Sequence, residues 1–331
     1  MSMPAAVLGD RGCGKTTFLA LLYATQIKYT NEPVNKDNFR FYATPTSLNF
    51  MGDMFNHLRS GGWPEATMKG QQTKVSFLFG FKRLGAGAIP DWIKKREWIN
   101  PFSTIKFSVY DVAGEDVNDI IRTPDGVFNE DLPEEVKNLL ESRILVVLVD
   151  ASRITAKPRS KPYIDMIEYD KKTATLISII AKYNSRKEDP KLRKIYPIFV
   201  FTKFDCVEDN ILQGMRLKEK PPDYKEDDDR RAFSETIMRN FFGQTLALIK
   251  GGKLMKVSFD YAAYFFSEIN TEFNEDGIPI PSIKVMDDGV GHELDFSYPE
   301  YRWFIDHFKK IANSMPDNIK EMQDFDSGKL D

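Results

Sequence analysis

The chain has 331 residues, of which 42% are hydrophobic and 13% are aromatic, so it carries enough apolar material for a sizeable core. Its net charge of −3 argues against a general nucleic-acid binder, because such a protein would show an excess of basic residues. Only two cysteines occur, which excludes a disulfide framework and predicts a protein of the reducing cytoplasm.

The first predicted elements are a short apolar strand over residues 4–9 and a helix over residues 15–28. The segment that joins them fits the pattern G-x-x-x-x-G-K-[ST], which wraps the phosphates of a nucleotide. The residues of this phosphate loop and of the first helical turn are Gly9, Asp10, Arg11, Gly12, Cys13, Gly14, Lys15, Thr16 and Thr17. A strand before the pattern and a helix after it are the setting that such a loop requires.

Each residue type in the phosphate loop has a physical reason. Glycines allow the backbone to curl until successive N–H groups point inward, and the helix that follows adds its positive N-terminal end. Lys15 would reach the β- and γ-phosphates, and the hydroxyl of Thr16 would ligate Mg²⁺. The loop therefore predicts nucleotide binding but does not specify the base.

Two strands are predicted next, one over residues 74–83 and one that ends at Asp111. Asp111 stands at the carboxyl end of its strand, where ligands gather in an open α/β sheet. A carboxylate there can hold a Mg²⁺-bound water, and Gly114 lets a backbone N–H approach a γ-phosphate. We therefore predict Asp111 as part of the metal site and Gly114 as a phosphate contact.

In the middle of the chain, helices and strands alternate. The predicted elements are a helix over 134–141, a buried strand over 144–149, a helix over 167–183 and a strand over 198–202. The last of these strands ends in Thr202, Lys203 and Asp205. A carboxylate at this place can accept hydrogen bonds from N1–H and the 2-amino group of guanine, whereas adenine lacks both donors. We predict that Asp205 selects guanine and that the ammonium of Lys203 braces the phosphate loop.

The C-terminal third is predicted to contain a helix near 228–250, a strand over 254–259 and a final helix with an apolar stripe over 301–312. Strands that alternate with helices in this way indicate an α/β protein with a mostly parallel sheet.

The segments Gly9–Thr16, Asp111–Gly114 and Thr202–Asp205 resemble, in this order, the first, third and fourth signature motifs of Ras-like GTPases. The resemblance implies a P-loop NTPase fold, a three-layer α/β sandwich with about six mostly parallel strands and helices on both faces. It also implies binding of GTP and GDP, dependence on Mg²⁺ and a molecular switch between the two nucleotide states.

The resemblance implies two further contacts. Ser258 and Phe259 end a strand where a Ras-like protein meets the O6 atom of guanine, although the usual Ser-Ala-Lys of the family is not matched. A threonine between the first helix and Asp111 should complete the Mg²⁺ shell when γ-phosphate is present. Thr67 is the first choice for this switch residue, because glycines and a proline precede it, and Thr73 is the alternative.

We expect residues 1–331 to form a single Ras-like domain with insertions over about 30–72, 84–102, 206–227 and 262–299. Within the first insertion, apolar residues at helical spacing over 45–59 predict a packed helix, with an effector-binding element as the alternative. Protein effectors and regulators would bind through these insertions. The sequence shows neither a signal peptide nor a lipidation motif, so any peripheral membrane association would depend on a partner.

Two residues bear on hydrolysis. Many Ras-like proteins have a glutamine after Asp-x-x-Gly that orients the attacking water, and this chain has Glu115 instead. A glutamate lacks the amide donor and carries a negative charge near the γ-phosphate, so we expect slow hydrolysis or a catalytic residue from an insertion or partner. Arg11 either stabilises developing charge in cis or extends into solvent, where it would crowd out a partner's arginine finger.

Three functions are compatible with these observations. The first is a GTPase that acts as a molecular switch, with Lys15, Gly114, Glu115 and Arg11 as candidate catalytic residues. The second is a GTP-bound scaffold or assembly protein with little or no hydrolysis, which Glu115 favours. The third is a P-loop kinase for a small molecule, in which the Thr202–Asp205 segment would have no role.

Overall fold

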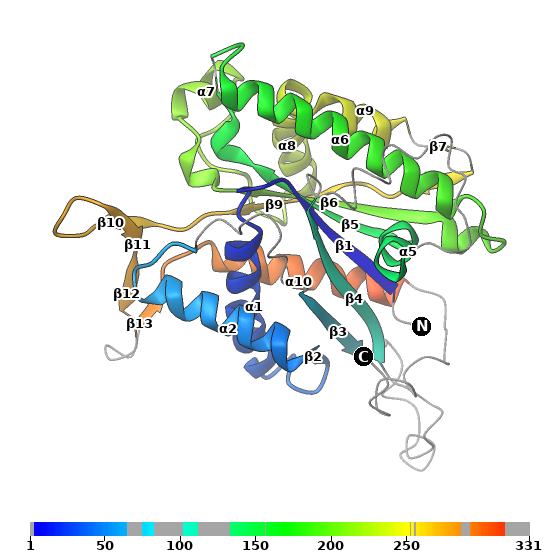
Figure 1. Ribbon diagram of the computed structural model, residues 1–331, viewed down its shortest axis with the longest axis horizontal. Coiled ribbons are helices and arrows are strands. Elements are labelled where there is room, and N and C mark those ends of the chain that lie inside the picture. The colour runs from blue at the N-terminus through cyan, green and yellow to red at the C-terminus, as the bar shows by residue number, and fades with distance from the viewer. Residues whose placement is uncertain are drawn as a thin grey trace.

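One large β-sheet organises the chain, and helices cover both of its faces (Figure 1). The computed structural model describes residues 3–64, 75–82, 102–111, 133–155, 157–251, 253–254, 256–285 and 292–314. Within these residues the sheet has nine strands: β1 (Met3–Gly9), β2 (Phe39–Ala43), β3 (Ser76–Lys82), β4 (Phe102–Asp111), β5 (Ile144–Asp150), β6 (Lys194–Thr202), β7 (Lys253–Leu254), β8 (Val257–Phe259) and β9 (Ala263–Ser267). The predicted α/β class with a mostly parallel sheet is confirmed.

The strands follow the spatial order β2-β3-β4-β1-β5-β6. The far side of β6 pairs with β8 at its beginning and with β9 along its carboxyl half. Strands β4, β1, β5, β6 and β9 run parallel, whereas β2 and β3 are antiparallel to the strands that they pair with. Because the parallel strands share one direction, their carboxyl ends lie at one edge of the sheet, where a ligand is expected.

Two layers of helices enclose the sheet (Figure 1). One layer contains α1 (Lys15–Asn31), α2 (Pro45–Arg59) and α10 (Tyr298–Asn313), and the other contains α5 (Glu134–Glu141), α6 (Lys161–Asn184), α8 (Asp227–Phe241) and α9 (Gly243–Lys250). Short helical segments connect them: η3 (Ala151–Arg153), η4 (Pro190–Arg193), η5 (Phe204–Cys206) and α7 (Asp209–Gly214).

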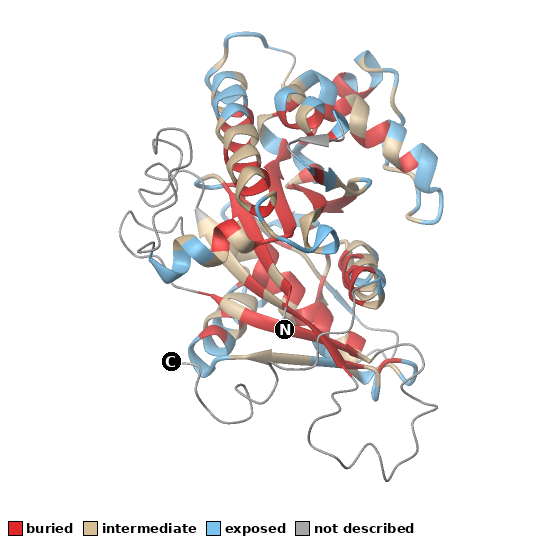
Figure 2. Ribbon diagram, turned by 90° about the vertical axis from the view of Figure 1, so that its right-hand side faces the viewer, coloured by how far each residue is buried: buried red, intermediate tan, exposed pale blue. Residues whose placement is uncertain are grey.

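Side chains of the central strands alternate between the two helical layers. In β1, Ala5 and Val7 belong to the core beneath α1 and α10, while Ala6 and Leu8 belong to the core beneath α5 and α6. All seven residues of β5 are buried. A strand that is covered on both faces needs apolar residues at every position, which explains the uninterrupted run in β5. Figure 2 shows the buried residues along the strands and on the helix faces turned toward them.

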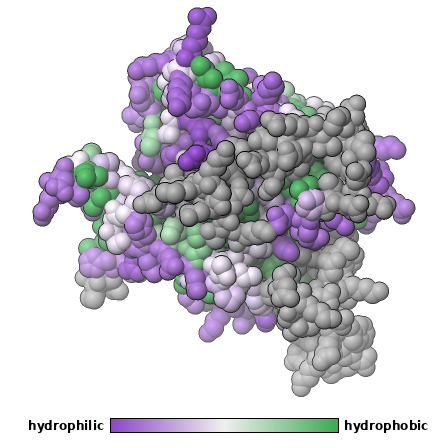
Figure 3. Space-filling model, viewed as in Figure 1, coloured by the Kyte–Doolittle hydropathy of each residue, from purple (hydrophilic) through white to green (hydrophobic). Residues whose placement is uncertain are grey.

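A small arm lies between β9 and α10 and projects from the sheet (Figure 1). It consists of two two-stranded sheets, one of β10 (Thr271–Phe273) with β11 (Pro279–Pro281) and one of β12 (Ile283–Val285) with β13 (His292–Leu294). The Nε1–H of Trp63, just after α2, donates to the carbonyl of Pro279 at 2.9 Å and ties the arm to this helix. Phe273 and Ile278 are exposed on the arm, where Figure 3 shows hydrophobic residues beside hydrophilic ones.

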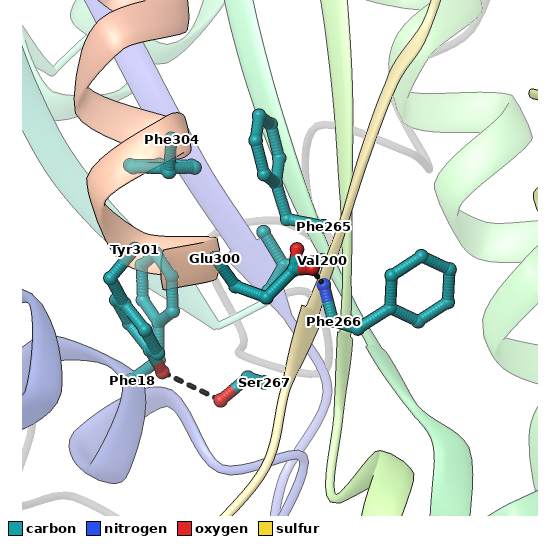
Figure 4. Close-up of a pocket in the computed structure, with 8 residues that line it drawn as sticks. All are labelled: Phe18, Val200, Phe265, Phe266, Ser267, Glu300, Tyr301 and Phe304. Atoms are coloured by element: carbon teal, nitrogen blue, oxygen red, sulfur yellow. Dashed lines mark hydrogen bonds between the residues drawn. The ribbon is translucent and has the colours of Figure 1, made fainter. Parts of the chain in front are cut away.

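The outer edge of β9 is covered by side chains instead of a further strand. Arg230 of α8 donates from Nε to the carbonyl of Tyr264 at 2.9 Å and forms an ion pair with Glu300 of α10. Glu300 in turn accepts from the backbone N–H of Phe266 at 3.0 Å. Figure 4 shows this carboxylate at the Phe266 nitrogen, beside a small pocket lined mainly by aromatic side chains. The ion pair thereby satisfies backbone groups that an open sheet edge would leave unpaired.

Most predicted elements are present, but the described part of the chain has nine strands in its main sheet instead of about six, and the strand expected over 254–259 is the antiparallel pair β7 and β8. There are three further differences. The strand β2 was not predicted, and the helix expected near 228–250 is divided at Phe242 into α8 and α9. The division follows from a tertiary contact, because the carboxylate of Asp170 in α6 accepts from the backbone N–H groups of Gln244 and Thr245, both at 2.9 Å, and so caps a new helix.

The third difference concerns the last strand of the main sheet. The insertion expected over 262–299 contains β9, which belongs to that sheet, so only the part after β9 stands apart as the arm. The packed helix predicted over 45–59 is confirmed as α2. None of the described helices combines the length and the apolar character needed to cross a bilayer.

Candidate nucleotide-binding site

The phosphate loop connects β1 to α1 at the carboxyl edge of the sheet. Gly12 and Gly14 have φ angles of 75° and 86°, in the left-handed region that side chains disfavour. At Gly9, a Cβ atom would lie 2.5 Å from the Sγ of Cys13, which is buried in the loop. The three glycines of the motif are therefore required by the backbone that the loop adopts.

The ammonium of Lys15 lies against the phosphate loop. Its Nζ donates to the carbonyls of Gly9 at 2.9 Å and Asp10 at 2.8 Å. Lys15 also begins α1, which has no acidic residue in its first turn, so the positive end of the helix is not neutralised there. Thr16 and Thr17 follow in the same turn and are only partly buried. The arrangement offers a cation, a helix terminus and a hydroxyl to an anion at one place.

Two residues at the end of β6 bond directly to the phosphate loop. The hydroxyl of Thr202 donates to the carbonyl of Cys13 at 2.6 Å, and Nζ of Lys203 donates to the carbonyl of Gly12 at 2.7 Å. Lys203 adopts a φ angle of 54°, so the chain turns sharply as it leaves the strand. The bracing contact predicted for Lys203 is present, and two motifs far apart in the sequence form one structural unit.

Asp205 follows in η5 at the same edge of the sheet. Loss of surrounding water raises the pKa of its carboxyl above the usual value, against opposing effects of hydrogen bonds from Cys206 and from the backbone of Ile269. Part of the Asp205 residue nevertheless remains exposed, two positions after the loop-bracing Lys203, so a ligand can reach it. Its position after the loop-bracing residues agrees with a role in recognising a base.

The prediction that Ser258 and Phe259 meet the base is wrong. They lie in β8, which pairs with Lys194 and Ile195 at the beginning of β6, at the opposite edge of the sheet from the phosphate loop. The strand that reaches the site is β9, because Ser267 is the register partner of Thr202.

The segment that the sequence prediction missed is therefore the end of β9. The backbone N–H of Ile269 donates to the Asp205 carboxylate. Glu268 stands between Ser267 and Ile269 in the chain. Burial and the nearby carboxylates of Asp205 and Glu300 raise the pKa of Glu268 to about 7. The aromatic run ahead of Ser267 was the available sequence signal for this strand.

The residues predicted to hold Mg²⁺ are only partly described. Asp111 is the last residue of β4 and the register partner of Gly9, so its backbone lies directly beside the start of the phosphate loop. Thr16 lies at the other end of that loop. A threonine hydroxyl and a carboxylate are hard oxygen donors of the kind that Mg²⁺ prefers. Thr67, Thr73, Gly114 and Glu115 lie outside the described residues.

Arg11 is exposed at the outer side of the phosphate loop. Its backbone N–H donates to the Oδ1 atom of Asp10 at 2.8 Å, which is a local turn contact. Whether Arg11 stabilises charge in cis or extends into solvent remains a matter of prediction.

The fold and the site together define an α/β protein with a glycine-rich loop braced at the carboxyl edge of its sheet. No model of a known protein family matches the chain, and no curated protein matches it.

Proposed function

We propose that this chain is a guanine-nucleotide-binding protein of the Ras-like class, with a P-loop NTPase fold. It binds GTP and GDP with Mg²⁺, hydrolyses GTP slowly and acts as a molecular switch toward protein partners. The observation that carries the proposal is the pair of contacts from Thr202 to the Cys13 carbonyl and from Lys203 to the Gly12 carbonyl. These contacts join the phosphate loop to the segment that holds Asp205.

The choice of guanine depends on Asp205. A carboxylate can accept from both N1–H and the 2-amino group of guanine, and an adenine at the same place would leave it unpaired. The geometry supports this role because Lys203, two positions before it in the chain, contacts the loop that would hold the phosphates of the same nucleotide. One ligand can then touch both segments.

Magnesium would be held by the hydroxyl of Thr16 and, directly or through a water, by Asp111, with Thr67 or Thr73 as the switch ligand. When bound, the ion would neutralise charge on the β- and γ-phosphates. Lys15 adds a second positive charge at the loop, and its present bonds to the Gly9 and Asp10 carbonyls keep the ammonium within the loop.

Nucleotide binding is tested with GDP, GTP, ADP and ATP in the presence of Mg²⁺. We expect guanine nucleotides to bind far more tightly than adenine nucleotides. We expect Asp205→Asn to weaken GDP binding by about 10- to 100-fold, the value of a charged hydrogen-bond acceptor. The same variant should gain affinity for xanthosine diphosphate, because an asparagine amide can donate to the 2-oxo group that replaces the 2-amino group. The matched control is Asp209→Asn, which neutralises an exposed aspartate of α7, and it should bind GDP like the wild type.

Equal affinity for ADP and GDP would overturn the role of Asp205. A hydrolysis measurement then separates a switch from a scaffold. Glu115→Gln should raise a slow GTP hydrolysis rate, because glutamine can donate to the transition state. Tight GTP binding with no turnover in either protein favours the scaffold, and phosphate transfer to an added acceptor would favour a kinase.

A further inference from the structure

A one-turn helical segment after β5 contacts the phosphate loop. It is η3, whose last residue is Arg153. The Nη1 atom of Arg153 donates to the Oδ2 atom of Asp10 at 2.6 Å, and its Nη2 atom donates to the carbonyl of Arg11 at 3.0 Å. One guanidinium therefore contacts a side chain and a backbone carbonyl of two successive loop residues, a geometry that a lysine cannot reproduce.

Asp150 anchors this guanidinium. Its side chain is 5% exposed and lies 3.4 Å from Nε of Arg153 and 3.1 Å from Nζ of Lys203. It also accepts from the backbone N–H and the hydroxyl of Ser152, which fixes the carboxylate within the turn. Asp150 is thus the common partner of two cations, and each cation also bonds to the phosphate loop.

The acidic side chain of Asp10 explains why the phosphate loop needs Arg153 in addition to Lys203. It is an acidic side chain inside a loop whose proposed ligand is a polyphosphate, and an unneutralised carboxylate there would repel that ligand. Arg153 and Asp10 are 14% and 22% exposed, so water screens their attraction only weakly. Among the described residues, Arg153 is the cation that forms an ion pair with Asp10.

We infer that Arg153 is a positioning residue of the nucleotide site, which neutralises Asp10 and holds the Asp10–Arg11 segment in the conformation that receives phosphates. This inference rests on the proposed function, because it assumes that the loop binds a nucleotide. Arg153 acts through the loop and does not itself contact the nucleotide. Asp150 makes the arrangement rigid by holding Arg153 and Lys203 close together, where they bond to the successive carbonyls of Arg11 and Gly12.

The charge of Asp10 distinguishes a positioning role of Arg153 from a role in folding alone. Without Arg153, the Asp10 carboxylate faces the phosphates unneutralised, while Asp150 keeps Lys203 as a partner. Removing the charge of Asp10 as well should then restore part of the lost affinity. A role of Arg153 in folding alone would produce no such restoration, because Asp10→Asn exchanges one carboxylate oxygen for an amide group and replaces no packing.

The test measures the affinity of a fluorescent N-methylanthraniloyl-GDP in Mg²⁺ buffer. Arg153→Met should weaken binding at least about tenfold, as expected when one partner of a little-exposed charge pair is truncated. The double variant Asp10→Asn/Arg153→Met should bind more tightly than Arg153→Met. Arg153→Lys should lie between Arg153→Met and the wild type, because a lysine keeps the charge but not the planar fork.

The matched control is Arg143→Met, at the other end of β5. Arg143 is also buried, at 7% exposure, and its Nη1 atom donates to a backbone carbonyl, that of Lys191 at 3.1 Å. This control should lower stability without changing the nucleotide affinity of the folded protein.

An Arg153→Met protein whose affinity for the probe lies within twofold of the wild type would overturn the inference. A double variant that recovers no affinity relative to Arg153→Met would overturn it too. If Arg153→Met does not fold, the comparison of Arg153→Gln with Asp10→Asn/Arg153→Gln carries the same test, because glutamine also lacks the charge. A wild-type protein that binds no guanine nucleotide would instead overturn the proposed function, and the inference with it.

Discussion

Two arginines with little exposure are held by carboxylates at two different edges of the same sheet. Arg153 lies at the carboxyl edge, between Asp10 and Asp150, and bonds to a carbonyl of the phosphate loop. Arg230 lies at the lateral edge, paired with Glu300, and bonds to the carbonyl of Tyr264 in the outermost strand. Both use a guanidinium to satisfy a carboxylate and a backbone acceptor at once.

The two arginines differ in how far a ligand can approach them. The side chain of Arg230 is 3% exposed and lies against the rings of Phe266 and Trp303, so no ligand can reach it. The side chain of Arg153 is 14% exposed and faces a loop in which Gly12 is exposed and Gly14 is partly exposed. The same chemistry thus closes a strand edge in one place and shapes the glycine-rich loop in the other.

The largest effect is expected at the strand edge. Arg230→Met leaves Glu300 buried without its cation, which should lower the free energy of unfolding by about 3–5 kcal/mol. Urea denaturation would measure the loss. Arg302→Met is a matched control on α10, because Arg302 is 45% exposed and pairs with Glu32, so its loss should cost at most about 1 kcal/mol.

The comparison between the two arginines fails if Arg230→Met, while still folded, also weakens GDP binding as strongly as Arg153→Met does. We expect the folded Arg230→Met protein to bind GDP like the wild type, since its contacts are with β9, α10 and the carbonyl of Pro222.

A smaller effect is expected at Glu268, which lies between the two regions. Its carboxylate is close to Asp205 of the site, to Glu300 of the strand edge and to Lys220. Burial and these two carboxylates raise its pKa from 4.5 to about 7, so its ionisation opposes folding. The stability that the neutral form contributes is fully present below about pH 4.5 and is lost as the pH rises through about 7.

Glu268→Gln removes this ionisation. The variant should be more stable than the wild type at pH 8 by about 1–3 kcal/mol and nearly equal to it at pH 4.5. Thermal or urea unfolding at the two pH values measures the difference, with Glu272→Gln in the exposed β10 strand as control. An equal stability difference at both pH values would show that packing, and not the charge of Glu268, is responsible.

Features that depend on interactions within one short segment could be predicted from the sequence, whereas features that depend on contacts between distant segments could not. The phosphate loop, β1 and α1 could be predicted because glycine spacing and apolar periodicity act within one short segment. The choice between β8 and β9 could not, because both are short apolar runs a few residues apart. Only the pairing with β6 places Ser267, and not Ser258, next to Thr202.

The contact between Arg153 and Asp10 also had no local signal. It depends on the parallel neighbours β1 and β5, which bring the loop after one strand against the turn after the other. An isolated Asp-Ala-Ser-Arg segment gives no reason to expect a partner in the phosphate loop. Such a residue is found from the sheet order and not from its own sequence.

The smallest expected effect concerns Thr202, which serves the fold and the site together. Thr202→Val removes the hydroxyl that bonds to the carbonyl of Cys13, at a cost of about 1 kcal/mol in the free energy of unfolding. Thr25→Val removes a similar bond, from a buried threonine of α1 to the carbonyl of Leu21, and should cost about as much. The two variants differ in what the lost bond holds, because only the bond of Thr202 fixes the loop. The rise in melting temperature caused by saturating GDP should therefore shrink in Thr202→Val and stay unchanged in Thr25→Val. Equal shifts in both variants would mean that the phosphate loop keeps its conformation without the end of β6.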